Sequence, residues 1–301
     1  MKLVTFDKGR IGIVDGERVI DVTDLADAQP GTWPPIGMVR LIAEWAERRS
    51  TLLDALTHRE SRPLNAVRLE APVQWPNKVI AFPANYHAHI DEMKHGAGSR
   101  VISAFKASGQ GFFLKANSSL SGPADDIVLP PLAGREIHHE CELGIVIGKR
   151  GRCATRAESR DYVFGFTCLL DMVVRGKEER VMRKSFDTFC PTGPWITTAD
   201  EIADFDDIQM RLLVNGEERQ SASTRNLIVD IPEMIAMSSA VMTLEPGDIV
   251  ASGTPAGVGP VEDGDLLEIR IDGVGSMELR VRQGELGDHP VWDEAKAGLA
   301  V

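Results

Sequence analysis

The sequence lacks the features of a disulfide-stabilised or membrane-spanning protein. Its 301 residues include four cysteines, and none of them stands in a Cys-x-x-Cys spacing, so we expect four buried free thiols rather than disulfide pairs or a zinc cluster. No apolar stretch approaches the length of a membrane span, and the apolar run at the N-terminus is too short for a signal peptide. These absences predict a cytoplasmic protein that does not bind a membrane.

Basic residues are in the minority. The chain has 33 Lys and Arg against 45 Asp and Glu, which gives a net charge of −12, and this balance disfavours nucleic acid or an anionic membrane as a partner. An anionic small substrate is still compatible with it, because lysines, arginines and a metal can reverse the charge inside one cleft. Hydrophobic residues make up 43% of the chain, enough for an ordinary globular core.

Two glutamates lie where a buried strand begins. Residues 143–147 form the apolar, β-branched run that is typical of a buried strand, and the strand is expected to start near His138. Because side chains alternate along a strand, His138, Glu140 and Glu142 are predicted to share one face. From this pattern alone, the alternative is that both glutamates are solvated on an exposed face.

A third carboxylate occupies a similar position. Asp171 directly follows a second strand-like run, residues 162–170. Carboxylates that lie close together and partly desolvated raise one another's pKa unless a cation compensates them. Three carboxylates without cysteine ligands suit Mg²⁺ or Mn²⁺ better than Zn²⁺.

This arrangement resembles the metal site of the fumarylacetoacetate hydrolase family, in which a His-x-Glu-x-Glu strand precedes an aspartate. Further family-like pieces occur in the expected order between about Val79 and Val281. They are Asn85-Tyr86 with His89 and Glu92, Lys115 in Phe-Leu-Lys, Lys184-Ser185-Phe186-Asp187, Pro191-Thr192-Gly193-Pro194, and the glycine-rich segment 253–259.

The expected fold is α+β and mainly β. Short strands separated by turns outnumber helices along the chain, and the resemblance implies a mixed β-sandwich roll that encloses the metal, usually as a homodimer. Residues 1–72 are expected to form a small N-terminal α/β accessory domain, with a helix whose apolar face includes Met38 and Trp45. Residues 73–301 would form the catalytic domain, with a lid around residues 84–111.

The lid contains a candidate catalytic dyad. His89 and Glu92 are three residues apart, so on a helix they share a face, although a solvated surface pair is the commoner meaning of such spacing. The resemblance implies that this pair activates water. His87 with Asp91 is the alternative dyad.

The remaining candidates take their roles from the resemblance. It implies that Lys184, the third catalytic candidate, reaches a substrate carboxylate and that Lys115 lies near the metal, whereas spacing alone is compatible with two exposed lysines. Thr254 is a candidate ligand for a substrate oxygen in a loop that would otherwise be a plain turn cluster. Tyr86, Arg175 and Glu178 are the other candidates for binding the substrate, besides Lys115 and Thr254.

Three departures from the family pattern bear on the identity of the substrate. Pro83-Ala84 replaces the usual Gly-Arg before the lid, residues 96–111 resemble an enlarged lid, and Gly176 with Glu178 replaces the usual Asp and Gln after Arg175. Glu178 is the last substrate-binding candidate, and it is expected to make that wall of the pocket more acidic.

The resemblance implies a metal-dependent hydrolase that cleaves a carbon–carbon bond in an acylpyruvate-like 1,3-diketo acid of the fumarylpyruvate or acylpyruvate type. Mg²⁺ is the expected cofactor, with Mn²⁺ or Ca²⁺ possible. Alternatives are an oxaloacetate-type 2-oxo acid decarboxylase and an isomerase or hydratase of 2-hydroxy-dienoates in aromatic catabolism. A catalytically silent metal-binding protein is a minor alternative.

Overall fold

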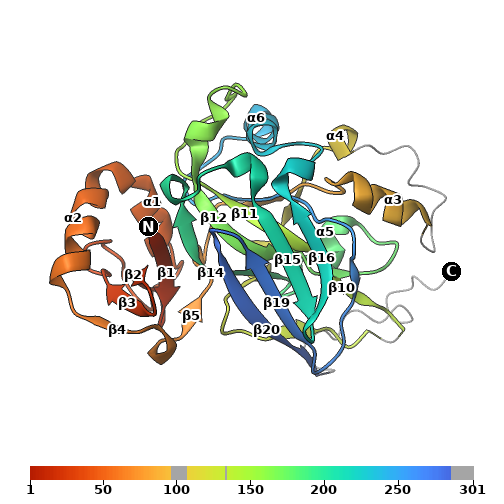
Figure 1. Cartoon of the computed structure of the whole chain (residues 1–301), viewed down its shortest axis with the longest axis horizontal. Helices are drawn as coiled ribbons and strands as arrows, with labels where there is room; N and C mark the ends of the chain where they lie inside the picture. The colour runs from red at the N-terminus through yellow and green to blue at the C-terminus, as the bar shows by residue number, and fades with distance from the viewer. Residues whose placement is uncertain (96–106, 133, 286–301) are drawn as a thin grey trace.

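A computed structural model describes residues 1–95, 107–132 and 134–285, and within them the chain is mainly β. A twelve-stranded sheet runs through the molecule from the N-terminal part at the left of Figure 1 into the C-terminal part. In order its strands are β4 (Ser61–Pro63), β3 (Arg18–Asp21), β2 (Arg10–Asp15), β1 (Lys2–Phe6), β14 (Cys190–Thr198), β12 (Val163–Leu170), β11 (Cys141–Ile147), β17 (Ile249–Ala251), β6 (Val79–Ala81) and β7 (Phe113–Lys115), with β5 (Leu69–Glu70) beside β1 and β8 (Leu120–Ser121) beside β14.

Two smaller sheets complete the β structure. The first consists of β13 (Val173–Val174), β10 (Ile137–His139) and β18 (Gly259–Pro260). The second consists of β16 (Glu217–Ser223), β15 (Gln209–Val214), β19 (Leu266–Ile271), β20 (Gly275–Gln283) and β9 (Ile127–Leu129). The predicted α+β, mainly β fold with mixed sheets is confirmed.

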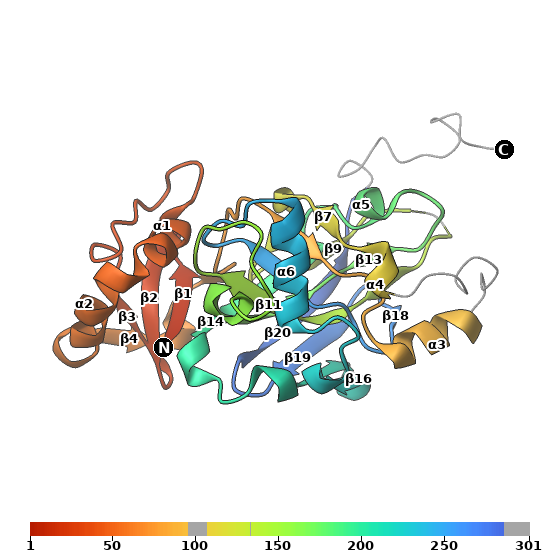
Figure 2. The same cartoon turned by 90° about the horizontal axis from the view of Figure 1, so that it is seen from above.

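Helices lie at both ends of the molecule and over one sheet face. Figures 1 and 2 both place α1 and α2 at the end opposite α3, with α6 across the large sheet. The α-helices are α1 (Gly37–Ala43), α2 (Trp45–His58), α3 (His87–His95), α4 (Ala107–Gln110), α5 (Arg180–Arg183) and α6 (Ile231–Val241). The 3₁₀ turns are η1 (Leu64–Ala66), η3 (Asn117–Ser119), η4 (Ser159–Tyr162), η5 (Ala199–Glu201), η6 (Phe205–Asp207) and η7 (Thr224–Asn226). Within the described ranges, no helix is long and apolar enough to cross a bilayer.

The N-terminal part shares its sheet with the rest of the chain. Strand β1 pairs with β14, with Leu3 opposite Ile196, and the core around Leu3 and Ile11 includes Val146 and Leu169 of the C-terminal part. The proposed division into residues 1–72 and 73–301 therefore separates two parts that have a continuous sheet and a common core.

The single helix expected around residues 38–45 is two helices. Met38 is buried as predicted, but α1 ends at Ala43, and α2 begins at Trp45 after a non-helical Glu44. This break turns the Trp45 ring edge-on to Phe164 on β12, with ring centroids 5.0 Å apart. The N-terminal helices are thereby packed against the strand that leads to Asp171.

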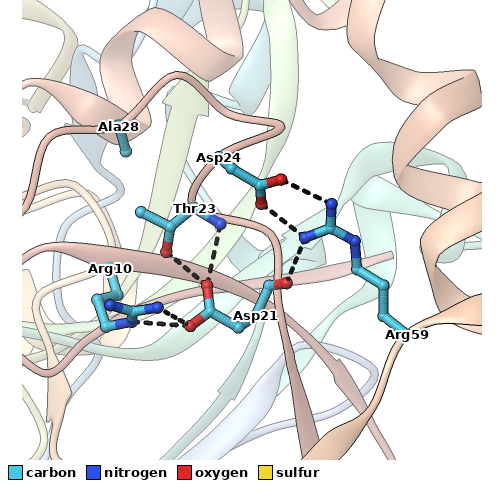
Figure 3. A pocket seen from close by; sticks show the side chains of 6 residues that line it. All are labelled: Arg10, Asp21, Thr23, Asp24, Ala28 and Arg59. Atoms are coloured by element: carbon cyan, nitrogen blue, oxygen red, sulfur yellow. Dashed lines mark hydrogen bonds and ion pairs between the residues drawn. The ribbon is translucent and has the colours of Figure 1, made fainter.

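One hollow of the described surface belongs to the N-terminal part, and its charged groups are paired with one another. It has a volume of about 530 Å³ and is lined by Arg10, Asp21, Thr23, Asp24, Ala28 and Arg59. Figure 3 shows Arg59 paired with Asp24 and Arg10 paired with Asp21. Because each charged group in this set is neutralised by another, the hollow is a structural feature rather than a candidate site.

Local residue chemistry explains a hairpin turn and the start of a helix, and one prediction about cysteine is wrong. The hairpin of β15 and β16 turns at Asn215 and Gly216, which have φ values of 52° and 82°, and the Asp230 side chain caps α6 by accepting from the amide of Glu233. The four cysteines are free, but Cys153 is exposed. Its φ of 54° places it in a turn rather than in a strand.

Candidate active site

The three predicted carboxylates meet because of the pairing of β11 with β12. Cys141 lies opposite Leu170, and one residue farther along the ladder the amide of Asp171 donates to the carbonyl of Glu140 over 2.9 Å. Glu140, Glu142 and Asp171 are buried and each offers one oxygen, all within 4.8 Å of one another. The alternative of an exposed, solvated pair of glutamates is therefore wrong.

The strand expected to run on from His138 is interrupted at Glu140. Strand β10 ends at His139 in the three-stranded sheet, and β11 begins at Cys141 in the large sheet. As a result, the His138 side chain lies outside the carboxylate group. Its Nδ1 accepts from Arg175 Nε over 2.9 Å, and its Nε2 lies 2.9 Å from the Glu136 carboxylate.

Two buried lysines compensate the carboxylates. Lys184 Nζ donates to Glu140 Oε2 over 2.6 Å and to Asp171 Oδ2 over 2.5 Å. Lys115 Nζ donates to Asp171 Oδ1 over 2.5 Å and to the carbonyls of Lys184 and Phe189 over 2.7 and 3.1 Å. Neither lysine is an exposed side chain, and all three donors of Lys115 are used within the protein.

Charge is distributed unequally among the three acids. Burial and the neighbouring Asp171 carboxylate raise the pKa of Glu142 well above its ordinary value. Burial also opposes ionisation of Asp171, but Lys115 and Lys184 hold its pKa below the ordinary value. Burial would lower the pKa of Lys184, but the surrounding carboxylates raise it. Glu142 is thus the acid that lacks a direct cationic partner, with its Oε2 accepting from the Gly253 amide over 2.8 Å.

This donor set fits a hard divalent cation. It consists of carboxylate oxygens from two neighbouring strands, already within 4.8 Å of one another, and Mg²⁺, Mn²⁺ and Ca²⁺ prefer oxygen ligands. A cation there would also relieve the repulsion that raises the pKa of Glu142.

Helix α3, in the segment expected to form the lid, brings together the residues of the predicted dyad. His89 is buried, and its Nδ1 lies 3.1 Å from Glu92 Oε2, whereas His87 is exposed. The hydrogen bond with His89 holds the pKa of Glu92 below its ordinary value. These positions favour His89 over His87 as the base. Residues 96–106 of the expected enlarged lid lie outside the described residues.

The dyad is tied to the glycine-rich loop. Glu92 Oε1 accepts from the amide of Gly257 over 3.0 Å. Gly257 has a φ of 93°, and a Cβ atom at this position would lie 1.8 Å from the carbonyl oxygen of Arg219. Only glycine can therefore present this amide to the lid without displacing β16.

Gln220 was not among the residues selected from the sequence, and it links that loop to the start of β11. Its buried side chain donates to Thr254 Oγ1 over 2.8 Å and accepts from the Cys141 amide over 3.0 Å. Thr254 in turn donates to the carbonyl of Cys141 over 3.0 Å. Thr254 therefore lies beside the start of β11, which carries Glu142 and directly follows Glu140.

Tyr86 is buried in the core, with its hydroxyl directed to Met210 Sδ at 4.0 Å. The neighbouring Asn85 fixes the base of the lid, because its amide nitrogen donates to the carbonyls of Val229 and Ser252, both over 2.8 Å. The structure thus gives Asn85 a positioning role that its place in the motif did not specify.

Arg175 and Glu178 lie on the rim of the carboxylate group. Arg175 Nη1 is 3.9 Å from Glu140 Oε1. Both carboxylate oxygens of Glu178 are bound by the guanidinium of Arg135, at 3.1 and 2.8 Å, so the wall is not made more acidic as the sequence had suggested. Arg135 was missed because its partner lies 43 residues away.

Comparison with known proteins identifies the family. Residues 78–282 match the family model for the fumarylacetoacetate (FAA) hydrolase C-terminal domain. The chain belongs to the fumarylacetoacetate hydrolase family. The resemblance drawn from the motifs is therefore confirmed.

Relatives in this family include hydrolases and an enzyme that acts on oxaloacetate. Maleylpyruvate hydrolase of Aquipseudomonas alcaligenes is 40% identical over 286 residues, which cover 94% of this chain and 99% of that protein. The crystal structure of maleylpyruvate hydrolase from Sphingobium sp. SYK-6 in complex with manganese(II) ion and pyruvate is 52% identical, with a TM-score of 0.85, and the match covers 95% of this chain and 100% of that chain. Oxaloacetate tautomerase FAHD1 of Mus musculus is 35% identical over 220 residues, which cover 70% of this chain and 95% of that protein.

Proposed function

We propose that this protein is a metal-dependent hydrolase that cleaves a carbon–carbon bond in an acylpyruvate-like 1,3-diketo acid, giving pyruvate and a carboxylic acid. The observation that carries the proposal is the convergence of three buried carboxylates within 4.8 Å in a chain that is 52% identical to a maleylpyruvate hydrolase crystallised with manganese and pyruvate.

Glu140, Glu142 and Asp171 would hold the cation, which we propose to be Mg²⁺ or Mn²⁺. When bound, the cation supplies Lewis-acid stabilisation of the negative charge that develops as the carbon–carbon bond breaks. Lys115 keeps Asp171 ionised and oriented through the 2.5 Å contact. Its role in this proposal is to position a ligand, since its donors are already bound within the protein.

His89 is the proposed general base. It would take a proton from water as the water oxygen adds to the distal carbonyl carbon, while Glu92 fixes the orientation of the ring. The carbon–carbon bond then breaks, its electron pair leaves with pyruvate as the enolate, and a proton returns to that carbon. The new carboxylic acid keeps the oxygen from water.

The acid end of the substrate would be oriented by Lys184 and Thr254. Lys184 Nζ already lies between Glu140 and Asp171, so a substrate carboxylate would take the place of part of this contact. Arg175 would bind from the rim, beside Glu140. Tyr86 would act indirectly, by packing at the base of the lid, because its hydroxyl contacts Met210.

A second candidate reaction is supported by the relative that acts on oxaloacetate, which is 35% identical. Decarboxylation, tautomerisation or isomerisation of a 2-oxo acid also passes through an enolate, and the carboxylate group with Lys184 would serve these reactions without attack by water. Their distinguishing feature is that the first chemical step does not require His89 to deprotonate water.

The deciding experiment offers acetylpyruvate, fumarylpyruvate, oxaloacetate and 2-hydroxyhepta-2,4-dienedioate to the protein with Mg²⁺ or Mn²⁺. Loss of diketone absorbance with stoichiometric pyruvate is the expected result, and chelation should abolish it. Release of CO₂ from oxaloacetate without cleavage of any diketone would replace the hydrolase by a decarboxylase. The proposed homodimer in the cytoplasm rests on the family resemblance, and sedimentation equilibrium tests the dimer.

A further inference from the structure

Helix α5 carries two arginines that form no ion pair with a carboxylate in the part of the chain that the structure describes, although Glu140 and Glu178 attract Arg183 from a greater distance. Arg183 donates from Nε to the carbonyl of Glu178 over 2.8 Å and from Nη1 to the carbonyl of Val174 over 3.1 Å. Arg180 donates to Gln110 Oε1 over 2.9 Å, and its guanidinium lies 5.3 Å from the centre of the Phe113 ring. Neutral groups orient both guanidinium groups, so their positive charge is available to an anion.

The acid nearest in sequence is occupied by another arginine. Glu178 binds Arg135 with both carboxylate oxygens and offers Arg183 only its backbone carbonyl. The Arg135–Glu178 pair passes directly over Gly176, where a Cβ atom would lie 1.8 Å from Arg135 Nη2 and 2.3 Å from Glu178 Oε2. Glycine at position 176 and glutamate at position 178, which together form one of the departures from the family pattern, therefore belong to one arrangement.

The neighbours of Arg183 contact the carboxylate group. Arg135 Nε donates to the carbonyl of Arg175 over 2.7 Å, and Arg175 Nη1 is 3.9 Å from Glu140 Oε1. Lys184, the residue after Arg183, reaches Glu140 Oε2 itself. Burial and repulsion from Arg175 and Arg180 lower the pKa of Arg183, and an anion bound among the three would relieve that repulsion.

We propose that Arg183, together with Arg180, forms a second carboxylate subsite, which selects diacidic acylpyruvates by binding the carboxylate at the end of the acyl chain. The inference rests on the proposed function, which identifies the other end of the substrate as the pyruvoyl group. The positioning residues of this subsite are Arg135, Glu178 and Gly176. They fix the backbone of Arg175 and the backbone carbonyl of Glu178, to which Arg183 donates.

The test compares two substrates that share the pyruvoyl end, fumarylpyruvate with a second carboxylate and acetylpyruvate without one. We expect Arg183→Met to lower kcat/KM for fumarylpyruvate by about 10- to 100-fold, mainly through KM, because a charge-assisted pair is lost. The same variant should change kcat/KM for acetylpyruvate by less than about threefold. Arg180→Met should act in the same direction. Arg211→Met, at an exposed position of β15, is the matched control.

Equal loss of both activities in the Arg183 and Arg180 variants would overturn the subsite, because the arginines would then serve the fold or the pyruvoyl carboxylate. Unchanged activity toward both substrates would overturn it as well. Arg183→Lys should restore part of the preference for the diacid, since it keeps the charge.

A binding measurement separates this inference from the proposed function. Calorimetric titration with maleate and with acetate requires no turnover, and maleate should bind the wild-type protein more tightly than it binds Arg183→Met. If the protein cleaves neither diketone, the hydrolase proposal fails while the maleate titration still decides the subsite. Equal maleate affinity in the wild type and the variant would refute it.

Discussion

Gln220 donates a hydrogen bond of 2.8 Å from its side-chain nitrogen to the hydroxyl of Thr254. The same nitrogen donates to the carbonyl of Pro255 over 2.9 Å, and the side-chain oxygen accepts from the Cys141 amide and from His139 Nδ1, both over 3.0 Å. All four hydrogen-bonding positions of the side chain are thus occupied in a buried place. Burial lowers the pKa of His139 to about 4, so its ring is neutral here at pH 7.

Replacement of Gln220 by Leu should therefore damage both stability and activity. The variant leaves several buried groups unsatisfied, and we expect the free energy of unfolding in urea to fall by about 2 to 4 kcal/mol. Activity should fall further than the folded fraction, because Thr254 and the start of β11 at Cys141 lose their common support. Gln209→Leu, at an exposed position of β15, should change stability by less than about 0.5 kcal/mol. Equal effects of the two replacements would show that the Gln220 contacts contribute little.

The candidate base is tested by a matched pair of histidines on α3. His89 is buried against Glu92, whereas His87 is exposed two positions before it on the same helical turn. We expect His89→Ala to lower kcat by at least about 100-fold because general-base assistance is lost, and His87→Ala to lower it by no more than about threefold. Manganese affinity, measured by calorimetry, should stay unchanged in both variants. A larger loss of kcat in His87→Ala would reassign the base.

The sequence predicted the parts of the site that depend on local pattern. Runs of apolar residues located β11 and β12, and the ordered motifs located the carboxylates, both lysines and the His89–Glu92 spacing. What could not be predicted depends on long-range pairing. The interruption at Glu140 follows from strand partners in two different sheets, and the Arg135–Glu178 pair joins residues 43 positions apart. Single-sequence patterns contain no signal for either.

Lys115 tests how the buried carboxylate group is compensated. Its side chain is inaccessible and contacts Asp171 and two carbonyls, so Lys115→Met should leave a buried carboxylate with one fewer cation. We expect a loss of about 3 to 5 kcal/mol in the free energy of unfolding without metal, and a smaller loss when manganese is present, because the ion supplies positive charge. Lys177→Met, at an exposed position, is the control. A variant as stable as the wild type would mean that Lys184 alone compensates Asp171.

Metal binding should release a proton from Glu142. Burial and the Asp171 carboxylate raise the pKa of Glu142 well above its ordinary value, so in metal-free protein the protonated form persists to a higher pH than for an exposed glutamate. A cation binds the ionised carboxylate and must displace that proton. Affinity for manganese is therefore expected to rise as the pH is raised, until the pH exceeds the raised pKa of Glu142, and to become constant above it.

Calorimetric titrations in buffers with different ionisation enthalpies measure the released proton directly. Glu142→Gln should remove the proton release and weaken binding by at least about 100-fold, because a charged ligand is lost. Glu136→Gln, whose exposed carboxylate lies beside His138, should leave both quantities unchanged. Affinity that does not depend on pH, with no proton released by the wild-type protein, would show that Glu142 is already ionised before the metal arrives.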